Sequence, residues 1–178
     1  SGSKERSKAS LWFFKTGKGQ YGEGDIFLGI TVPEQRKTAN EFKELSFIDI
    51  KRLLESKIHE HRFVALEILV MRYEKGDDKE KKNIVSFYLK NIDQVNNWDL
   101  VDTSAPYILG HFLYNKDKEI LYKLARSKSV WKKRVAIVST SYFIGQRLYE
   151  DTIKIAEILL HDKHDLIHKA VGWMLREV

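Results

Sequence analysis

Hydrophobic residues recur at helical spacing along almost the whole chain. The clearest example is HRFVALEILVMRYEKG, residues 61–76, which is strongly periodic and ends at a glycine. No stretch alternates convincingly between apolar and polar residues, and the chain has only two prolines, so a sheet is not expected. The pattern predicts an all-helical protein. Its helices are expected to form antiparallel pairs over residues 33–56, 59–91, 104–126 and 129–161, followed by an unpaired helix from residue 165 to the end.

Capping residues place several of the helix boundaries. Thr31 followed by Pro33 is typical of a helix start, because Thr can cap the helix and proline fits its first turn. Ser46 is expected to cap the next helix. Further along, Ser104 has the position of a cap and Pro106 that of a first turn, so a new helix is predicted to begin there.

A helix pair every 30 to 40 residues or so is the signature of an α-solenoid of the HEAT type, with a concave face lined by successive repeats. A compact helical bundle is the alternative. The solenoid domain is expected to span residues 11–178, after a cloning remnant at the first three residues and an N-terminal extension to residue 10. The last helix has no evident partner for its face of Ala170, Val171 and Leu175, which predicts that the natural domain continues further.

Composition narrows the class of protein. A chain of 178 residues, 43% hydrophobic and 31% charged, suits one soluble globular domain, and its apolar runs are too short to cross a bilayer. The absence of cysteine excludes disulfides, thiol catalysis and cysteine-ligated zinc, and it fits a reducing cytoplasm, where we expect the protein to reside.

The positive charge is concentrated in one region. Residues 115–134 hold eight Lys or Arg and two acidic residues, so this segment has a net charge of +6. The whole chain has the same net charge. Such a run is commonly the solvated face of a helix. Its clustering beside Trp131 also suits a surface that binds the phosphates of nucleic acid.

The segment at residues 17–22 matches G-x-G-x-x-G, the fingerprint of dinucleotide-binding folds. That motif requires a preceding strand and a βαβ unit, and no strand is predicted here. A flexible loop is the favoured interpretation, although its main-chain N–H groups could approach a phosphate backbone.

Two other clusters suggest chemistry only weakly. His161, His164 and His168 have roughly helical spacing, but no carboxylate–histidine motif accompanies them, so surface histidines are favoured over a metal site. Residues 139–141 are Ser, Thr and Ser without a visible histidine partner, which argues against a serine hydrolase.

A more coherent group forms if successive repeats converge on one face. It combines tryptophans, one acid and a basic stripe, and its members are Trp98, Asp102, Trp131, Lys132, Lys133, Arg134 and Trp173. Aromatic faces and a carboxylate attract positive charge, whereas Lys and Arg hold phosphates. The group suits a cationic substrate on a polyanion. Each tryptophan could instead simply fill the core, but Asp102 has no evident partner nearby.

The chain resembles the DNA alkylation repair enzymes of the AlkD family, which are HEAT-like-repeat DNA glycosylases. The segments that carry the resemblance are YGEGDIFLGITVPEQR, NNWDLVDTSAPYILG, SVWKKRVAIVSTSYFI and HKAVGWMLRE. By this resemblance, Asp102 matches the catalytic aspartate, Trp98 and Trp173 match active-site tryptophans, and Arg134 matches a DNA-contacting arginine. Tyr21 matches a tyrosine near the first loop of the family.

The resemblance implies hydrolysis of the N-glycosidic bond of purines alkylated at N3 or N7 in duplex DNA, by a monomer without a metal or organic cofactor. An ionised Asp102 would stabilise the oxocarbenium-like transition state. Related HEAT-repeat proteins bind DNA without glycosylase activity, so a non-catalytic DNA-binding protein is the first alternative. A protein-binding solenoid is the second.

Overall fold

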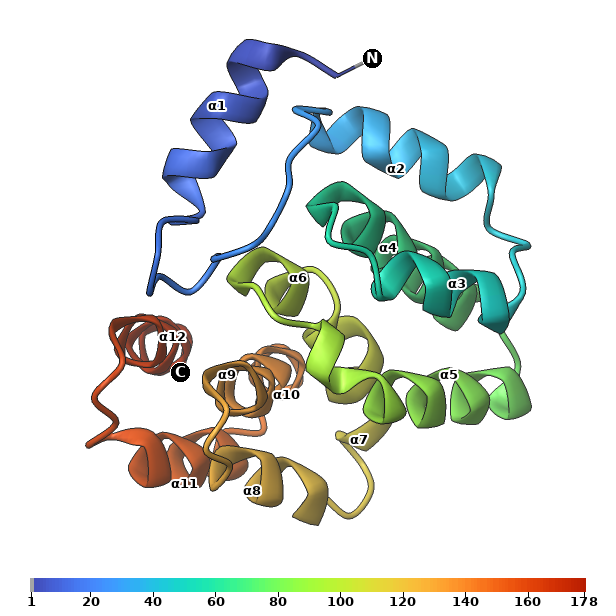
Figure 1. Cartoon of the computed structure of the whole chain (residues 1–178). Coiled ribbons are helices and arrows are strands. Elements are labelled where there is room, and N and C mark those ends of the chain that lie inside the picture. The colour runs from blue at the N-terminus through green and yellow to red at the C-terminus, as the bar shows by residue number, and fades with distance from the viewer. Residues whose placement is uncertain (1) are drawn as a thin grey trace. The chain divides into compact units, whose positions relative to one another are not determined.

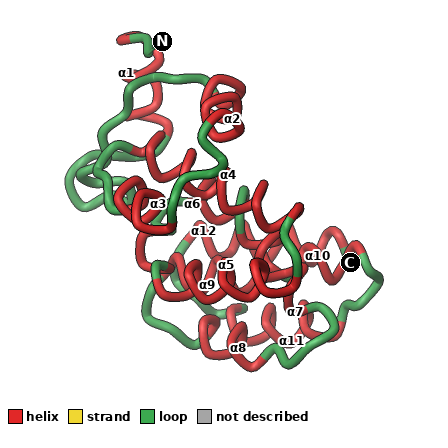
Figure 2. The backbone as a smooth tube through the Cα atoms, turned by 90° about the vertical axis from the view of Figure 1, so that its right-hand side faces the viewer, coloured by secondary structure: helices red, strands yellow, loops and turns green. Residues whose placement is uncertain are grey.

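The computed structural model describes residues 2–178, and its regular secondary structure is all helical, as the periodicity predicts (Figure 1). Within these residues no strand occurs, and one isolated backbone bridge joins Ile26 to Ile58. Short loops connect most of the helices (Figure 2). The chain divides into two compact units, one ending at Lys75 and the other beginning at Gly76.

The first unit is built around a central helix. Its elements are α1 (Lys4–Phe13), α2 (Val32–Glu41), α3 (Phe47–Leu54) and α4 (His59–Lys75). Helices α2 and α3 both pack against α4. Residues 62–70 of α4 are buried without interruption, because apolar side chains surround this helix on nearly all sides.

The long connector between α1 and α2 is tied to α4 by buried charges. The carboxylate of Glu60 accepts hydrogen bonds from the backbone N–H groups of Leu28 and Gly29, at 2.9 and 2.8 Å. Arg62 donates to Asp25 at 2.7 Å. Residues 17–24 of this connector form turns with no strand before them, so the loop interpretation of the glycine-rich motif is confirmed.

The second unit is arranged around α9. Its elements are α5 (Asp78–Lys90), the 3-10 turn η1 (Ile92–Gln94), α6 (Trp98–Asp102), the π-helical segment η2 (Pro106–Gly110), α7 (His111–Leu113), α8 (Glu119–Ala125), α9 (Val130–Ser139), α10 (Ser141–Gly145), α11 (Glu150–Leu159) and α12 (Asp165–Glu177). Helix α9 packs against α6, α8, α11 and α12. Its residues 134–139 are buried on every side, so α9 forms the core of this unit.

The predicted helix boundaries are largely confirmed. Thr31 precedes α2, and the Glu34 carboxylate accepts hydrogen bonds from its backbone N–H and its hydroxyl, at 3.0 and 2.7 Å. Ser46 caps α3 by accepting from the backbone N–H of Asp49 at 3.2 Å. Within the pair expected over residues 129–161, the first helix is interrupted at Thr140, between α9 and α10.

Two local predictions were wrong. Ser104 does not cap a helix: it is buried, its hydroxyl donates to the carbonyl of Leu100 at 2.6 Å, and it lies 2.9 Å from the hydroxyl of Tyr88. A buried hydroxyl needs such partners, and these contacts hold α6 against α5. The last helix also has partners: α12 packs against α9 and α11, which buries Ala170 and Val171, whereas Leu175 stays 42% exposed.

Gly110 permits close packing beneath α9 and α10. A Cβ atom at this position would lie 2.3 Å from the carbonyl oxygen of Ser139 and 2.8 Å from Cβ of Tyr142. The nearest obstacle is backbone, which cannot rotate away. Gly110→Ala should therefore lower the free energy of unfolding by about 1–3 kcal/mol, as measured by urea denaturation.

Gly172 provides the matched control, because nothing lies within 4 Å of a Cβ at this position inside α12. Gly172→Ala should raise the free energy of unfolding by up to about 1 kcal/mol, since alanine favours helix more than glycine does. Equal changes in the two variants would contradict the packing described for Gly110.

Candidate active site around Asp102

The short helix α6 presents Trp98 and Asp102 from the same side. Its first turn is capped by Asn97, whose side chain accepts from the backbone N–H of Trp98 at 2.8 Å. Leu100 and Val101 are fully buried and anchor the helix. Trp98 and Asp102 are four residues apart, so their side chains lie one above the other on the helix, and both are half-buried.

Asp102 has a partner that the sequence did not indicate. Nε of Arg134 donates to Oδ1 of Asp102 at 2.9 Å, and Nη2 donates to Oδ2 at 2.7 Å. The side chain of Arg134 is 7% exposed and that of Asp102 is 20% exposed. The expectation that Asp102 lacks a nearby partner is thus wrong, because α9 brings Arg134 to it across 32 residues of sequence.

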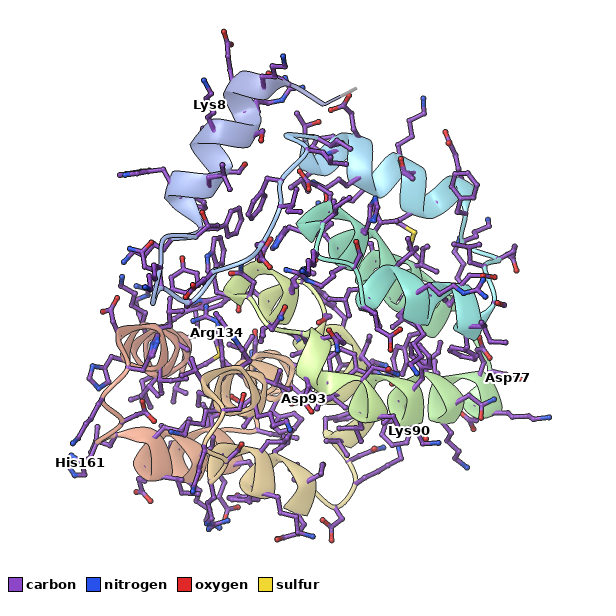
Figure 3. All side chains as sticks on the ribbon, viewed as in Figure 1. Lys8, Asp77, Lys90, Asp93, Arg134 and His161 are labelled. Carbon is purple, nitrogen blue, oxygen red and sulfur yellow. The ribbon has the colours of Figure 1, made fainter. Side chains whose placement is uncertain are left out.

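Arg134 also binds the last helix. Its Nη1 donates to the carbonyl oxygen of Leu166 in α12 at 2.8 Å. One guanidinium therefore joins α6, α9 and α12, and the region around it is marked by Arg134 in Figure 3. The planar fork of an arginine suits this arrangement, since it offers several donors in fixed directions.

The surroundings of Asp102 act on its charge in opposite directions. Burial raises the pKa of the Asp102 carboxyl above its ordinary value, and the negative charge of Asp99 raises it further. The hydrogen bonds and positive charge of Arg134 lower the same pKa. Arg134 therefore keeps a partly buried carboxylate ionised over a wider range of pH than burial alone would allow.

The basic residues that precede Arg134 are engaged with acids. Lys132 lies 2.7 Å from Asp93, and Lys133 donates to Asp162. Asp93 is largely exposed, and ion pairs of this kind contribute little in water, so Lys132 can exchange its partner for a phosphate at low cost. Trp131 is half-buried in the first turn of the same helix. Contacts of these three residues with DNA stay predictions.

The remaining predicted site residues lie on other elements. Trp173 is half-buried in α12, two helical turns beyond the Leu166 carbonyl that Arg134 binds. Tyr21 belongs to the first unit, where its hydroxyl donates to the carbonyl of Phe13 at 3.5 Å. The structure thus brings Asp102 and Arg134 into direct contact, and the parts assigned to Trp173 and Tyr21 stay predictions.

Two of the three histidines and two of the three hydroxyl residues of the other clusters bond to backbone groups close to them in sequence. Nδ1 of His164 accepts from the backbone N–H of Leu166 and caps α12, and His168 binds the carbonyl of Asp162. Ser139 and Thr140 are buried and donate to backbone carbonyls of their own helix. Among residues 2–178, no group of three His, Asp or Glu side chains could hold a metal ion.

Comparison with known proteins identifies the family. The family model described as "DNA alkylation repair enzyme" matches residues 1–178, so the chain belongs to this family. Among solved structures, a protein described as a predicted DNA alkylation repair enzyme from Enterococcus faecalis is similar in fold, with a TM-score of 0.69 and 16% identity. The match covers 99% of this chain and 82% of that one.

The search of curated proteins found no match. Within the described residues, no helix has the length and apolar character needed to span a membrane.

Membership of the DNA alkylation repair family supports a role in the repair of alkylated DNA.

The contact between Arg134 and Asp102 predicts a pH-dependent loss of stability. Arg134→Met removes the group that lowers the pKa of Asp102, so burial raises that pKa unopposed. When the folded-state pKa of an acid lies above its unfolded-state pKa, the fold loses stability as the pH rises from the unfolded value to the folded one. The full loss is present above the folded-state pKa. Arg134→Met should lower the free energy of unfolding by about 3–5 kcal/mol at pH 8. The loss should shrink at pH 5, where more of the carboxyl is protonated.

The same substitution in an Asp102→Asn background is the control. There, the loss caused by Arg134→Met should be smaller and nearly independent of pH, because no carboxylate is left to titrate and Arg134 loses only its bonds to the amide oxygen at position 102 and to the Leu166 carbonyl. Urea denaturation of the four proteins at both pH values supplies the comparison. A loss that is equal at pH 5 and pH 8 in the parent background would contradict the role given to Arg134.

Proposed function

We propose that this chain is a DNA glycosylase that hydrolyses the N-glycosidic bond of purines alkylated at N3 or N7 in duplex DNA. The observation that carries the proposal is the carboxylate of Asp102, which is partly exposed and held through both oxygens by Arg134. Membership of the DNA alkylation repair family supports damaged DNA as the substrate.

The chemistry of the substrate suits a site that has one carboxylate. Alkylation at N3 or N7 gives the purine a formal positive charge, which weakens its bond to C1′ of the deoxyribose. When this bond breaks, the electron pair goes to the base nitrogen, so the base leaves as a neutral molecule. Positive charge then grows on the sugar, as in other glycosyl transfers, and water adds to C1′ and loses a proton.

Asp102 is the residue proposed to act on the sugar. Its ionised carboxylate opposes the growing positive charge, and a free lone pair can orient the attacking water and accept its proton. Arg134 approaches from the protein interior, so the pair forms a dipole whose negative end belongs to the more exposed partner. Preorganised charge of this kind is commonly worth about 3 kcal/mol or more of transition-state stabilisation.

Tryptophans contribute a weaker version of the same interaction. Trp98 lies one helical turn from Asp102, and the face of its indole would attract the positive charge on the sugar. Trp173 would attract the same charge from α12. Each such contact contributes about 1–2 kcal/mol when it is desolvated. Asp102 is therefore expected to dominate catalysis.

Duplex DNA is the proposed partner, and the basic turn at the start of α9 is the proposed contact with phosphates. Trp131, Lys132 and Lys133 are only half-buried there. Tyr21, in the first unit, is a separate proposed contact that rests on the resemblance. Arg134 enters in another way: its guanidinium is almost fully buried and makes three hydrogen bonds within the protein. This favours a positioning role over a phosphate contact.

Asp102→Asn should lower the rate of 7-methylguanine release at least about 100-fold, because the neutral amide cannot oppose the sugar cation. Affinity for the same duplex should stay within a few-fold of the parent. The measurement is single-turnover release of the base from a methylated duplex, together with a binding titration. Asp99→Asn is the matched control, since Asp99 lies on the same short helix and should retain activity within about twofold.

A second duplex that contains uracil tests the substrate class. A neutral base leaves poorly and requires a pocket that reads it by hydrogen bonds, so uracil release should stay at background. Equal rates for Asp102→Asn and the parent would overturn the mechanism, and efficient uracil release would overturn the substrate class. Salt-sensitive DNA binding without release of any base would favour the non-catalytic alternative.

A further inference from the structure

The outer face of α1 carries an indole that the fold leaves in water. Trp12 is 84% exposed, and among the described residues no other large apolar side chain is exposed to the same degree. Its neighbours Leu11 and Phe13 are exposed as well. Exposed apolar residues that adjoin one another commonly mark a binding surface, because a partner that covers them removes them from water.

Contacts on the opposite side of α1 fix this orientation. The hydroxyl of Ser7 donates to the carbonyl oxygen of Phe27 at 2.7 Å, and the ring of Phe14 stacks on that of Phe27 with centroids 4.9 Å apart. These contacts hold α1 against the connector that precedes α2. Trp12 lies five residues after Ser7, and an α-helix turns by about 100° per residue, so the indole points away from the connector.

The turn that carries Trp12 is closed by its own hydrogen bonds. The backbone N–H and the hydroxyl of Thr16 both donate to the carbonyl oxygen of Leu11, at 3.2 and 3.1 Å. The backbone N–H of Lys15 donates to the Trp12 carbonyl at 3.2 Å, and the φ of Lys15 is 50°, which ends the helix. The indole therefore projects from a fixed backbone, so little ordering is needed when a partner binds.

Positive charge surrounds this indole. Residues 4–18 contain five Lys or Arg and one acid, Glu5, so the segment has a net charge of +4. Lys4, Lys8 and Trp12 follow one another at intervals of four residues and therefore lie along one side of α1, where Figure 3 marks Lys8. Ammonium groups in line with an aromatic ring suit a strand in which phosphates alternate with bases.

The same turn also adjoins a proposed contact with DNA. The hydroxyl of Tyr21 donates to the carbonyl oxygen of Phe13 at 3.5 Å, so the tyrosine lies against the end of α1 that carries Trp12. A paired base hides both of its faces in the duplex stack, whereas an unpaired base exposes them. An exposed indole among lysines therefore fits a strand with unpaired bases better than it fits an intact duplex.

The arrangement of α1 argues against a membrane as the partner. A helix that lies in a membrane interface has one apolar face along its length, with its charges on the other face. In α1, the exposed apolar residues occur only in the last turn, and Lys4 and Lys8 lie on the same side as Trp12. The charges and the apolar surface are thus not segregated, and a polyanion with aromatic groups matches both.

We propose that Trp12 stacks on an unpaired base of DNA while Lys4 and Lys8 bind the phosphates of the same strand. The inference rests on the proposed function in that DNA is the partner, and it adds the form of DNA that the first unit recognises. It uses none of the residues around Asp102, so the binding does not depend on release of a base.

Two strands of equal charge test the stacking. One contains about 12 thymidines, and in the other every base is replaced by an abasic analogue. The full chain should bind the thymidine strand about tenfold more tightly, as measured by fluorescence anisotropy of labelled strands. Trp12→Ala should remove most of this preference. Trp12→Phe retains an aromatic face, so its affinity for the thymidine strand should stay within about threefold of the parent.

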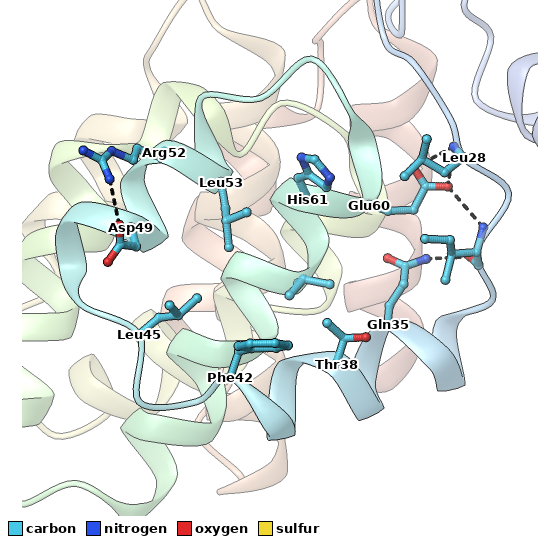
Figure 4. Close-up of a pocket in the computed structure, with 12 residues that line it drawn as sticks. Leu28, Gln35, Thr38, Phe42, Leu45, Asp49, Arg52, Leu53, Glu60 and His61 are labelled. Carbon is cyan, nitrogen blue, oxygen red and sulfur yellow. Dashed lines mark hydrogen bonds and ion pairs between the residues drawn. The ribbon is translucent and has the colours of Figure 1, made fainter. Parts of the chain in front are cut away.

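Lys8→Ala separates the phosphate contact from the stacking. It should weaken the binding of both strands equally and reduce the slope of log K against log salt by about 0.7, since a phosphate contact does not read the base. Phe42→Ala is the control for loss of an exposed aromatic residue in the same unit. Phe42 lines a pocket among α2, α3 and α4 (Figure 4) and has Glu41 and Glu44 close to it in sequence, so the preference should not change.

All strands are free of lesions, so the result is distinguishable from a failure of the glycosylase activity. Base release from a methylated duplex without a preference for the thymidine strand would overturn this inference alone. A preference that persists undiminished in Trp12→Ala would also overturn it. Binding to phosphatidylglycerol vesicles in place of the thymidine strand, lost in Trp12→Ala, would overturn it in favour of a membrane.

Discussion

The ion pair between Arg134 and Asp102 is the contact on which the second unit and its candidate site depend. Two charges leave water to form it, at a cost of several kcal/mol for each ion. That cost is offset because both carboxylate oxygens accept from the guanidinium, and the remaining donor reaches the Leu166 carbonyl. The contact fixes α6, α9 and α12 and, at the same time, holds the acid with which the proposed reaction is carried out. The same ion pair therefore stabilises the fold and orients the proposed catalytic carboxylate.

The repeat architecture explains how such distant residues meet. Asp102 lies 32 residues before Arg134, and Leu166 lies 32 residues after it, which is close to one helix pair. In the first unit, the bond from the Leu28 backbone to Glu60 also spans 32 residues. Solenoid repeats place equivalent positions of successive helix pairs beside each other. Polar side chains about 30 residues apart are therefore neighbours in space, and a buried charge finds its partner in the adjacent repeat.

The predictable part of the fold is the part governed by local pattern. Apolar periodicity located the helices, because an amphipathic or buried helix requires it, and Ser46 marked a boundary through its own hydrogen bond. The partner of Asp102 depends on packing between repeats, so Arg134 was assigned to DNA from its basic stripe and from the resemblance. The repeat spacing could have identified it. Ser104 was misassigned for a similar reason, since its partner Tyr88 lies on α5, beyond the intervening α6.

The central claim is that an ionised Asp102, held by Arg134, supplies the electrostatic stabilisation for base release. Its most direct test combines two titrations of the parent protein: the single-turnover rate of 7-methylguanine release as a function of pH, and the NMR titration of the Asp102 carboxyl carbon. The account predicts that the rate falls on acidification with the same midpoint as the carboxyl, and that this midpoint lies above the ordinary value for aspartate because burial raises the pKa. A rate that stays at its maximum where Asp102 is already protonated would contradict the account.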